Sequence, residues 1–381
     1  MIYLDNSATT RPFPSVAERM AACLSEDYFN PSALYASGMR AKTLVEEARS
    51  AVLSALPGAE KLVFTSGGTE ADNLAIFGVA QALRGRKARF VASAVEHPAV
   101  LRAMERLQAG GHEVFFAPVR ENGVVDVQAL ADLVDESTAL VSVMQVNNET
   151  GAIQPIAALS RAIKAKNPGV LLHVDGVQGF LRCPIDLKRD GVDFYSLSAH
   201  KIHGPKGVGA LAVAGKRNLL PALYGGGQEG GLRSGTENVP GIVGLGQAVR
   251  AYQNLPSPSD ALMQMKLRLA AGILSSVEGA AVNGPLPGEG APHILNIGFP
   301  LRGELFLHAL EGEGILVSTG SACSNIQKTA SHVLKAMSLP SGRIEGAIRF
   351  SLSPLNTMDE IEETIAAAQR CSAQYRRFVR R

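Results

Sequence analysis

The sequence predicts an α/β fold in which helices sandwich a mainly parallel sheet and a smaller α+β unit follows towards the C-terminus. Short apolar runs alternate with segments of helical periodicity through the middle of the chain, as in repeated strand–helix units. Most of these runs are apolar at every position, which is typical of parallel strands covered on both faces. With 381 residues, of which 46% are hydrophobic, the chain is long enough for two or three domains.

The predicted strands of the sheet are short apolar runs bounded by polar or glycine-containing turns. In chain order they cover residues 62–65, 90–93, 114–117, 139–144, 170–174, 194–197 and 208–213. Helical periodicity fills the connections at 70–83, 98–109, 127–134 and 156–166. Ligands of such sheets bind beyond the carboxyl ends of the strands, so we expect the functional residues directly after them.

The second part of the chain begins after a Pro-Ser-Pro-Ser run at 256–259, which we interpret as a helix break and the domain boundary. A helix over 239–254 is expected before this run and a helix over 261–277 after it. The later pattern predicts the parts of a smaller unit at 294–299, 303–313, 347–352 and a helical tail at 359–379.

Charge, composition and cysteine spacing exclude several protein classes. The 37 basic and 35 acidic residues give a net charge of +2, which argues against a polybasic nucleic-acid binder. The first residues lack a signal-peptide pattern, and no apolar stretch is long enough to span a membrane, so we expect a cytoplasmic protein with reduced cysteines. No CxxC pair and no HExxH pattern occurs, so we predict no metal site. The four cysteines are Cys23, Cys183, Cys323 and Cys371.

The ends of two predicted strands carry residues suited to binding an anion and a flat ring. The turn 65–70 reads Thr-Ser-Gly-Gly-Thr-Glu, whose glycines and free helix N–H groups suit a phosphate. The alternative is an ordinary turn with a threonine cap, and the Walker pattern is absent. His97, after the next strand, can stack on an aromatic ligand or move protons, and a structural histidine is its alternative.

Two later strand ends carry a carboxylate and a lysine. Asp175 follows a very apolar run, where an unpaired charge would be costly, and Gln178 lies three residues on. Lys201 follows Ser198 and His200, which can both bind an anion, and precedes a Gly-Pro-Lys-Gly turn. Such a lysine can form a Schiff base with a carbonyl ligand, and a solvated lysine is the alternative.

These strand-end residues together match the needs of one cofactor. Pyridoxal 5'-phosphate requires a Schiff-base lysine, a carboxylate at its pyridine nitrogen and an anion site for its phosphate. A flat stacking partner is also favourable. Because all four occur at strand ends, the combination favours pyridoxal phosphate more strongly than any single residue does.

The sequence resembles the cysteine desulfurases, in the class V aminotransferase group of fold-type I pyridoxal-phosphate enzymes, over nearly its whole length. The motifs that carry the resemblance lie at residues 3–10, 30–32, 64–70, 96–98, 147–151, 175–178, 198–201, 233–236 and 320–323. The resemblance implies a seven-stranded sheet in a large domain over residues 14–255. It also implies a small domain made of residues 1–13 and 256–381, with a catalytic cysteine loop at about 318–331.

The resemblance implies a role for each matching residue. Lys201 would hold the cofactor, and His97 would stack on its ring and transfer protons. Asp175 would contact the pyridine nitrogen and Gln178 the ring hydroxyl. The implied cofactor-binding set is completed by Gly68, Thr69, Asn148, Ser198, His200 and, from the other subunit of a homodimer, Thr236.

The implied reaction converts L-cysteine to L-alanine. Arg349 and Asn148 would bind the substrate carboxylate, and bidentate contact suits an arginine. Cys323 lies in a small, polar run beside a lysine, where a thiol is a candidate for reactivity, whereas the other cysteines lie in apolar or helical contexts. The thiolate of Cys323 would attack the substrate sulfur and keep it as a persulfide. The sulfur would pass to an acceptor or iron–sulfur scaffold protein. A further role of Cys323 as a transient ligand of an iron–sulfur cluster is left as an alternative.

Other functions remain as alternatives at this point. A selenocysteine lyase or another class V aminotransferase would share most of these residues. An inactive sulfur-carrier or scaffold subunit is the non-enzyme alternative. The chain departs from the family pattern at residues 327–330 and 353–354, which concerns the choice of acceptor more than the chemistry.

Overall fold

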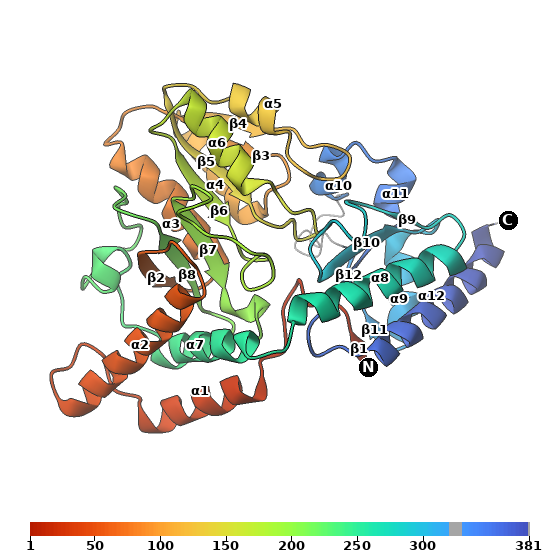
Figure 1. The fold of residues 1–381 in the computed structure, drawn as a ribbon, viewed down its shortest axis with the longest axis horizontal. Coiled ribbons are helices and arrows are strands. Elements are labelled where there is room, and N and C mark those ends of the chain that lie inside the picture. Colours follow the sequence, from red (N-terminus) through yellow and green to blue (C-terminus); the bar gives the residue numbers. More distant parts are fainter. Residues whose placement is uncertain (320–329, 380–381) are drawn as a thin grey trace.

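The computed structural model describes residues 1–319 and 330–379, the last five of them by their backbone alone. Its centre is a seven-stranded sheet in the order β2-β8-β7-β6-β5-β3-β4, in which only β8 runs antiparallel to its neighbours (Figure 1). The strands are β2 Lys61–Thr65, β3 Arg89–Ser93, β4 Glu113–Ala117, β5 Thr138–Met144, β6 Leu171–Asp175, β7 Phe194–Ser198 and β8 Gly209–Val213. The predicted α/β class and mainly parallel sheet are confirmed.

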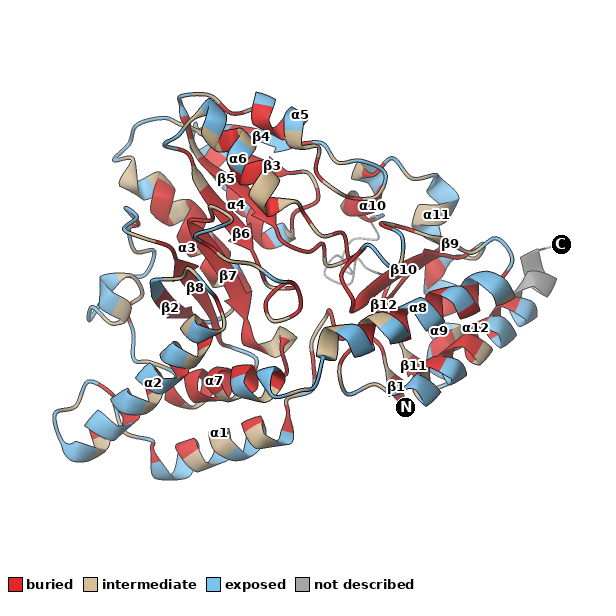
Figure 2. Cartoon of the chain, viewed as in Figure 1, coloured by how far each residue is buried: buried red, intermediate tan, exposed pale blue. Residues whose placement is uncertain are grey.

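Helices cover both faces of this sheet because its strands are apolar on both sides. Leu62 and Phe64 of β2 pack into one core cluster, and Val63 between them packs into another. Figure 2 shows the inner strands buried along almost their full length, whereas the edge strand β4 is exposed at Glu113, Phe115 and Phe116. The face that includes Val63 is covered by α3 Gly68–Ala82 and α4 Pro98–Ala109. The other face is covered by α2 Ala36–Ser54, α5 Val127–Asp132, α6 Ile156–Lys166 and α7 Val239–Gln253, and α1 Pro14–Glu26 packs on α7.

The C-terminal part builds a second core around a three-stranded antiparallel sheet, β12-β10-β9. The N-terminal strand β1 belongs to this part, because Ile2 pairs with Ile315 and Tyr3 with Leu316 of β11. Its strands are β1 Ile2–Tyr3, β9 Ala281–Val282, β10 Ile294–Gly298, β11 Ile315–Leu316 and β12 Ala347–Ser351. Its helices are α8 Pro258–Ser276, α9 Gly303–Gly312, α10 His332–Ala336, α11 Ser341–Glu345 and α12 Met358–Val379.

The structure shows the predicted break between two helices, because α7 ends at Gln253 and α8 begins at Pro258. Helix α8 begins three residues earlier than expected, inside the Pro-Ser-Pro-Ser run. Proline is well tolerated in the first helical turn, where its missing N–H would have no partner in the helix. Among the described residues, no helix is both long and apolar enough to cross a membrane.

Candidate active site

A cavity of about 290 Å³ lies where the ends of the parallel strands meet the C-terminal sheet. It gathers most of the residues that the sequence singled out, from both parts of the chain. Those that line it are Gly68, Thr69, His97, Asn148, Asp175, Gln178, Ser198, His200, Lys201 and Arg349. Thr236 is exposed and does not line it, and Cys323 lies outside the described residues.

The lysine of this cavity is held by the N-terminal segment. Lys201 ends the short 3-10 helix η1 (Ala199–Lys201), which directly follows β7. Its Nζ donates hydrogen bonds to the carbonyl oxygens of Ser7 at 2.6 Å and Ala8 at 2.8 Å. Its own carbonyl accepts a hydrogen bond from the buried Arg182. Side-chain amine and backbone are therefore both fixed at the edge of the sheet.

The carboxylate of Asp175 ends β6 and is 5% exposed. Its Oδ1 accepts a hydrogen bond from the N–H of Val177 at 2.9 Å. Burial, and next the charge of Asp72, raise the pKa of Asp175 to about 7. A positively charged ring nitrogen placed here would favour the ionised carboxylate.

A second buried acid, Asp72, also lines the cavity and was missed by the sequence analysis. Its Oδ1 lies 3.5 Å from Nε2 of His173, whose Nδ1 is 2.8 Å from Oγ of Ser142. Burial raises the pKa of Asp72 to about 7 and lowers that of His173 to about 4. The first two turns of α3 also contain Thr69, Glu70 and Asn73, so no local pattern in the sequence set this acid apart.

Protonated Asp72 is expected to contribute less to the stability of the cofactor-free chain as the pH rises from about 4 to about 7, and Asp72→Asn should remove this pH-dependent contribution. The pKa of Asp72 is raised from 3.8 to about 7, so in this window the unfolded chain releases a proton that the folded chain retains. Each pH unit then lowers the free energy of unfolding by ~1.4 kcal/mol for such a group.

Urea denaturation of both proteins near pH 4 and pH 8 measures the effect. The difference in unfolding free energy between variant and wild type should change by roughly 2–4 kcal/mol between the two conditions, in favour of the variant at the higher pH. A difference that does not depend on pH would show that Asp72 is not a buried, titrating acid.

Gly68, Thr69 and His200 of the cavity lining are suited to an anion. Helix α3 begins at Gly68, so its first N–H groups have no acceptor within the helix. A Cβ atom at Gly68 would come within 2.6 Å of Cγ2 of Val177, which leaves this backbone no room for a side chain. His200 contributes a ring whose Nδ1 lies 3.1 Å from Oγ1 of Thr9. Burial, and then the charges of Lys201 and Lys206, lower the pKa of His200 to about 4.

His97 and Gln178 present defined hydrogen-bonding groups to the cavity. His97 caps helix α4, where its Nδ1 accepts a hydrogen bond from the N–H of Ala99 at 3.1 Å. The proton of the neutral ring is therefore on Nε2. Burial, and next the charge of Lys201, lower the pKa of His97 to about 4. Nε2 of Gln178 donates to the carbonyl of Ser7 at 3.0 Å.

Arg349 reaches the cavity from β12 of the C-terminal sheet and is 3% exposed. Its Nη1 donates to the carbonyl of Asn148 at 2.9 Å, and its Nη2 pairs with Oδ1 of Asp5 at 2.6 Å. Its backbone N–H bonds to the carbonyl of Ser318 at 2.6 Å. The segment expected to carry the catalytic cysteine therefore starts beside the arginine of the cavity.

Comparison with known proteins agrees with this arrangement. The sequence pattern of the family described as aminotransferase class-V matches residues 2–364. The chain belongs to this family. Curated relatives in the class-V family include "Cysteine desulfurase IscS" of Clostridium botulinum, 39% identical over 380 residues that cover 98% of this chain and 95% of the relative. "Cysteine desulfurase" of Bradyrhizobium diazoefficiens is 42% identical over 370 residues, which cover 96% of this chain and 93% of the relative.

Solved structures show the same class-V fold. A structure named "NIFS-LIKE PROTEIN" superposes with a TM-score of 0.91 at 37% sequence identity. The superposition covers 98% of this chain and 99% of the other chain. The α/β architecture with its central seven-stranded sheet is therefore shared with a solved structure.

Class-V aminotransferases and the related cysteine desulfurases use pyridoxal phosphate, and the cavity fits this cofactor. The buried carboxylate of Asp175 suits the pyridine nitrogen, and the amine of Lys201 suits the carbonyl carbon. The free N–H groups at Gly68 and Thr69 suit the phosphate. The donor set thus contains each type of group that the cofactor requires.

Proposed function

We propose that this class-V aminotransferase is a cysteine desulfurase, which converts L-cysteine to L-alanine and passes the sulfur to an acceptor. The convergence of Lys201, Asp175 and Arg349 on one cavity carries the proposal. Asp175 ends β6 of the large sheet, Lys201 lies directly after β7, and Arg349 comes from the small sheet, so substrate and cofactor groups meet between the two. The cysteine desulfurases among its relatives support the choice of substrate.

The residues of the cavity divide into cofactor and substrate groups. Lys201, Asp175 and Gln178 would hold the ring of pyridoxal phosphate. Gly68, Thr69, Ser198 and His200 would hold its phosphate. The bound cofactor supplies an electron sink for the carbon atoms of the amino-acid substrate. Arg349 and Asn148 would bind the substrate carboxylate, with the guanidinium now paired to Asp5 turning to share the new anion.

Proton transfer falls to Lys201 and His97. Nζ of Lys201 donates hydrogen bonds to two carbonyl oxygens, which orient it. The lowered pKa of His97 keeps this ring neutral at pH 7, so it can exchange a proton at Nε2 without carrying a charge in the resting state.

Cys323 would carry the sulfur. Its thiolate attacks the sulfur of L-cysteine, the S–S bond forms, and the bond between that sulfur and the substrate carbon breaks. The electron pair remains with the three-carbon fragment, which takes up a proton and leaves as alanine. The sum is cysteine plus thiol giving alanine plus persulfide, with no external oxidant.

The described flanks of the 318–331 segment support this role. Ser318 is bonded to the backbone of Arg349, and Oγ of Ser331 donates to Oε2 of Glu149 at 2.6 Å. Both attachment points therefore lie beside residues of the cavity rim, Arg349 and Asn148. Five residues of chain span at most about 17 Å, so Cys323 must stay within that distance of Ser318.

We also propose a homodimer in which Thr236 binds the cofactor phosphate of the partner subunit. Thr236 is exposed and does not line the cavity of its own chain. Large apolar side chains are exposed around the connection between α1 and α2, which is unfavourable in water and would be relieved by a second copy. They are Leu24, Tyr28, Leu34, Tyr35 and Met39.

The division into domains and the location in the cell belong to the same proposal. Residues 14–255 would act as the large domain, and residues 1–13 with 256–381 as the small one, in line with the pairing of β1 and β11. We place the protein in the cytoplasm, where a sulfur acceptor or an iron–sulfur scaffold protein would receive the persulfide sulfur.

The experiment that tests the function is an assay of the purified protein with L-cysteine and a thiol reductant. We expect a yellow protein that releases alanine and sulfide in equal amounts. L-Selenocysteine and amino-group acceptors, offered in parallel, separate a selenocysteine lyase or a transaminase from a desulfurase. A colourless protein that takes up no pyridoxal phosphate would overturn the proposal.

A further inference from the structure

The glycine-rich segment, residues 223–236, ends at the exposed Thr236 and is folded into a compact loop. A bridge joins Leu223 to Arg233 near its two ends. Within it, the N–H of Gly235 donates to Oε1 of Gln228 at 2.9 Å. Gly235, which directly precedes Thr236, is therefore held by the side chain of Gln228, which directly precedes Glu229.

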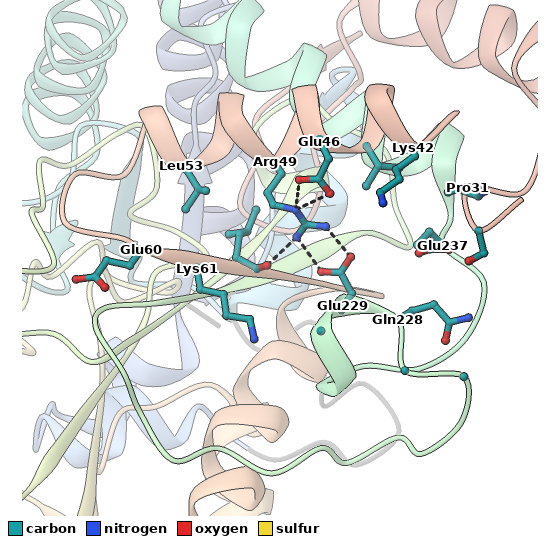
Figure 3. Close-up of a pocket in the computed structure, with 16 residues that line it drawn as sticks. Pro31, Lys42, Glu46, Arg49, Leu53, Glu60, Lys61, Gln228, Glu229 and Glu237 are labelled. Carbon is teal, nitrogen blue, oxygen red and sulfur yellow. Dashed lines mark hydrogen bonds and ion pairs between the residues drawn. The ribbon is translucent and has the colours of Figure 1, made fainter. Parts of the chain in front are cut away.

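Glu229 ties the glycine-rich segment to the body of its own chain (Figure 3). Its carboxylate forms a two-pronged ion pair with Arg49 of α2, with Nη2 to Oε1 at 2.8 Å and Nη1 to Oε2 at 2.9 Å. Its Oε2 also accepts a hydrogen bond from the N–H of Phe64 at 2.9 Å. The side chain of Glu229 is only 4% exposed, so the pair is largely shielded from water.

Arg49 is itself fixed, so it can serve as an anchor. Its Nη1 also donates to the carbonyl of Leu62 at 2.7 Å, and its guanidinium lies 4.7 Å from the ring centre of Phe64. Both partners belong to β2, which leads into the turn that starts α3. The glycine-rich segment is thus attached to the strand that carries this chain's own anion site.

The backbone of Glu229 argues that its side chain is needed. Its φ is +51°, a left-handed conformation that is unfavourable for a residue with a Cβ atom. Gly230 and Gly231, which follow, also have positive φ values, as this turn favours. A glutamate at such a position gives up backbone stability for the contacts of its carboxylate.

A second ion pair anchors the same segment. Nε of Arg233 lies 2.9 Å from Oε1 of Glu70 in the first turn of α3. The other oxygen of Glu70 accepts the N–H of Ser66 at 2.7 Å. The segment is therefore attached to the body of the chain at Glu229 and again at Arg233, three residues before Thr236.

We propose that Glu229 and Arg49 are positioning residues for phosphate recognition across the subunit interface. Their ion pair holds Gln228 against the N–H of Gly235 and so fixes Thr236 in the position from which it reaches the partner's cofactor phosphate. This inference rests on the proposed function, in which Thr236 contacts that phosphate.

The test compares cofactor affinity with and without the phosphate group. Full-length protein is stripped of cofactor and titrated with pyridoxal phosphate and with pyridoxal, followed by absorbance. Glu229→Gln should weaken binding of pyridoxal phosphate about tenfold, the size of one lost hydrogen bond, and leave the affinity for pyridoxal unchanged. In a Thr236→Val background, the same substitution should have no further effect.

A matched control is Glu46→Gln. Glu46 also contacts Arg49, at 3.1 Å, but its side chain is 53% exposed and it lies outside the glycine-rich segment. We expect wild-type affinity for both ligands, because exposed ion pairs contribute little. If Glu229→Gln does not fold, Arg49→Lys, which keeps the charge but loses the two-pronged contact, takes its place in the titrations.

The outcomes separate the inference from the function on which it rests. A Thr236→Val variant that loses affinity beside a Glu229→Gln variant that keeps it would overturn the positioning role alone. Equal weakening of pyridoxal phosphate and pyridoxal by Glu229→Gln would do the same, since it indicates general loosening of the chain. A Thr236→Val variant with wild-type affinity would overturn the role of Thr236 and the inference with it.

Discussion

Lys201→Ala is expected to abolish turnover of L-cysteine, with a loss of about 10³-fold or more in kcat. The amine of Lys201 is fixed in the cavity by the carbonyls of Ser7 and Ala8. The substitution removes this amine, which would both hold the cofactor and transfer protons. Alanine production at saturating cysteine measures the loss. Borohydride reduction followed by peptide mass spectrometry should attach the cofactor to residue 201 of the wild type and not of the variant.

The control for this variant is Lys206→Ala. Lys206 is exposed and lies in the same turn, five residues further on. We expect it to retain wild-type kcat and cofactor content. A Lys201→Ala protein that kept a tenth of the wild-type rate would refute the assignment of this lysine.

Cys323→Ser is expected to reduce the rate of sulfide release about 10³-fold while cofactor content stays at the wild-type level. Serine is close to cysteine in size but is a far weaker nucleophile. A thiol can lose its proton near neutral pH to form a thiolate, whereas a serine hydroxyl stays protonated. The two readouts differ from those of Lys201→Ala, which should lose the covalently held cofactor as well. Persulfide detected by mass spectrometry after one turnover should map to residue 323.

A matched control in the same segment is Ser321→Ala, which leaves the thiol in place and should release sulfide at the wild-type rate. Sulfide release that survives in Cys323→Ser would exclude the persulfide route. The described cysteines, Cys23, Cys183 and Cys371, are all buried, and burial raises the pKa of each thiol. None of these three is therefore suited to replace Cys323 as nucleophile.

Much of the central fold could be predicted because its apolar pattern is strong. The helices predicted at 98–109 and 156–166 coincide with α4 and α6. Their buried residues recur at helical spacing and are clearly apolar, as with Val100, Met104 and Leu107 in α4. Because neighbouring parallel strands end at one edge, the residues after them could also be placed together before the structure was known.

Helix α2 was not predicted although it has the same periodicity. Its buried stripe consists of Gly38, Ala41, Val45, Ala48 and Val52, at spacings of three and four residues. Small side chains fill the contact with α7, so the hydropathy contrast between its two faces is weak. The sequence has the helical spacing of buried residues but lacks the strong contrast between an apolar and a polar face from which a helix is predicted.

Site residues could be predicted where the chemistry requires a particular side chain, such as a lysine or a carboxylate. Every residue has a backbone carbonyl, so the sequence could not show that those of Ser7 and Ala8 hold Lys201. The pairing of Arg349 with Asp5 joins residues far apart in the chain, and no local pattern links them. These contacts follow from the tertiary fold alone.

The pairing of β1 with β11 has a consequence for how the protein is made. Ile2 is synthesised more than 300 residues before its partner Ile315. At roughly 5–20 residues per second, this strand waits about 15–60 s for its place in the sheet. Ser7 and Ala8, which hold Lys201, follow directly behind that strand. A nascent chain can therefore complete its central sheet but not its cavity, and capture of the cofactor must wait until β11 and β12 have been synthesised.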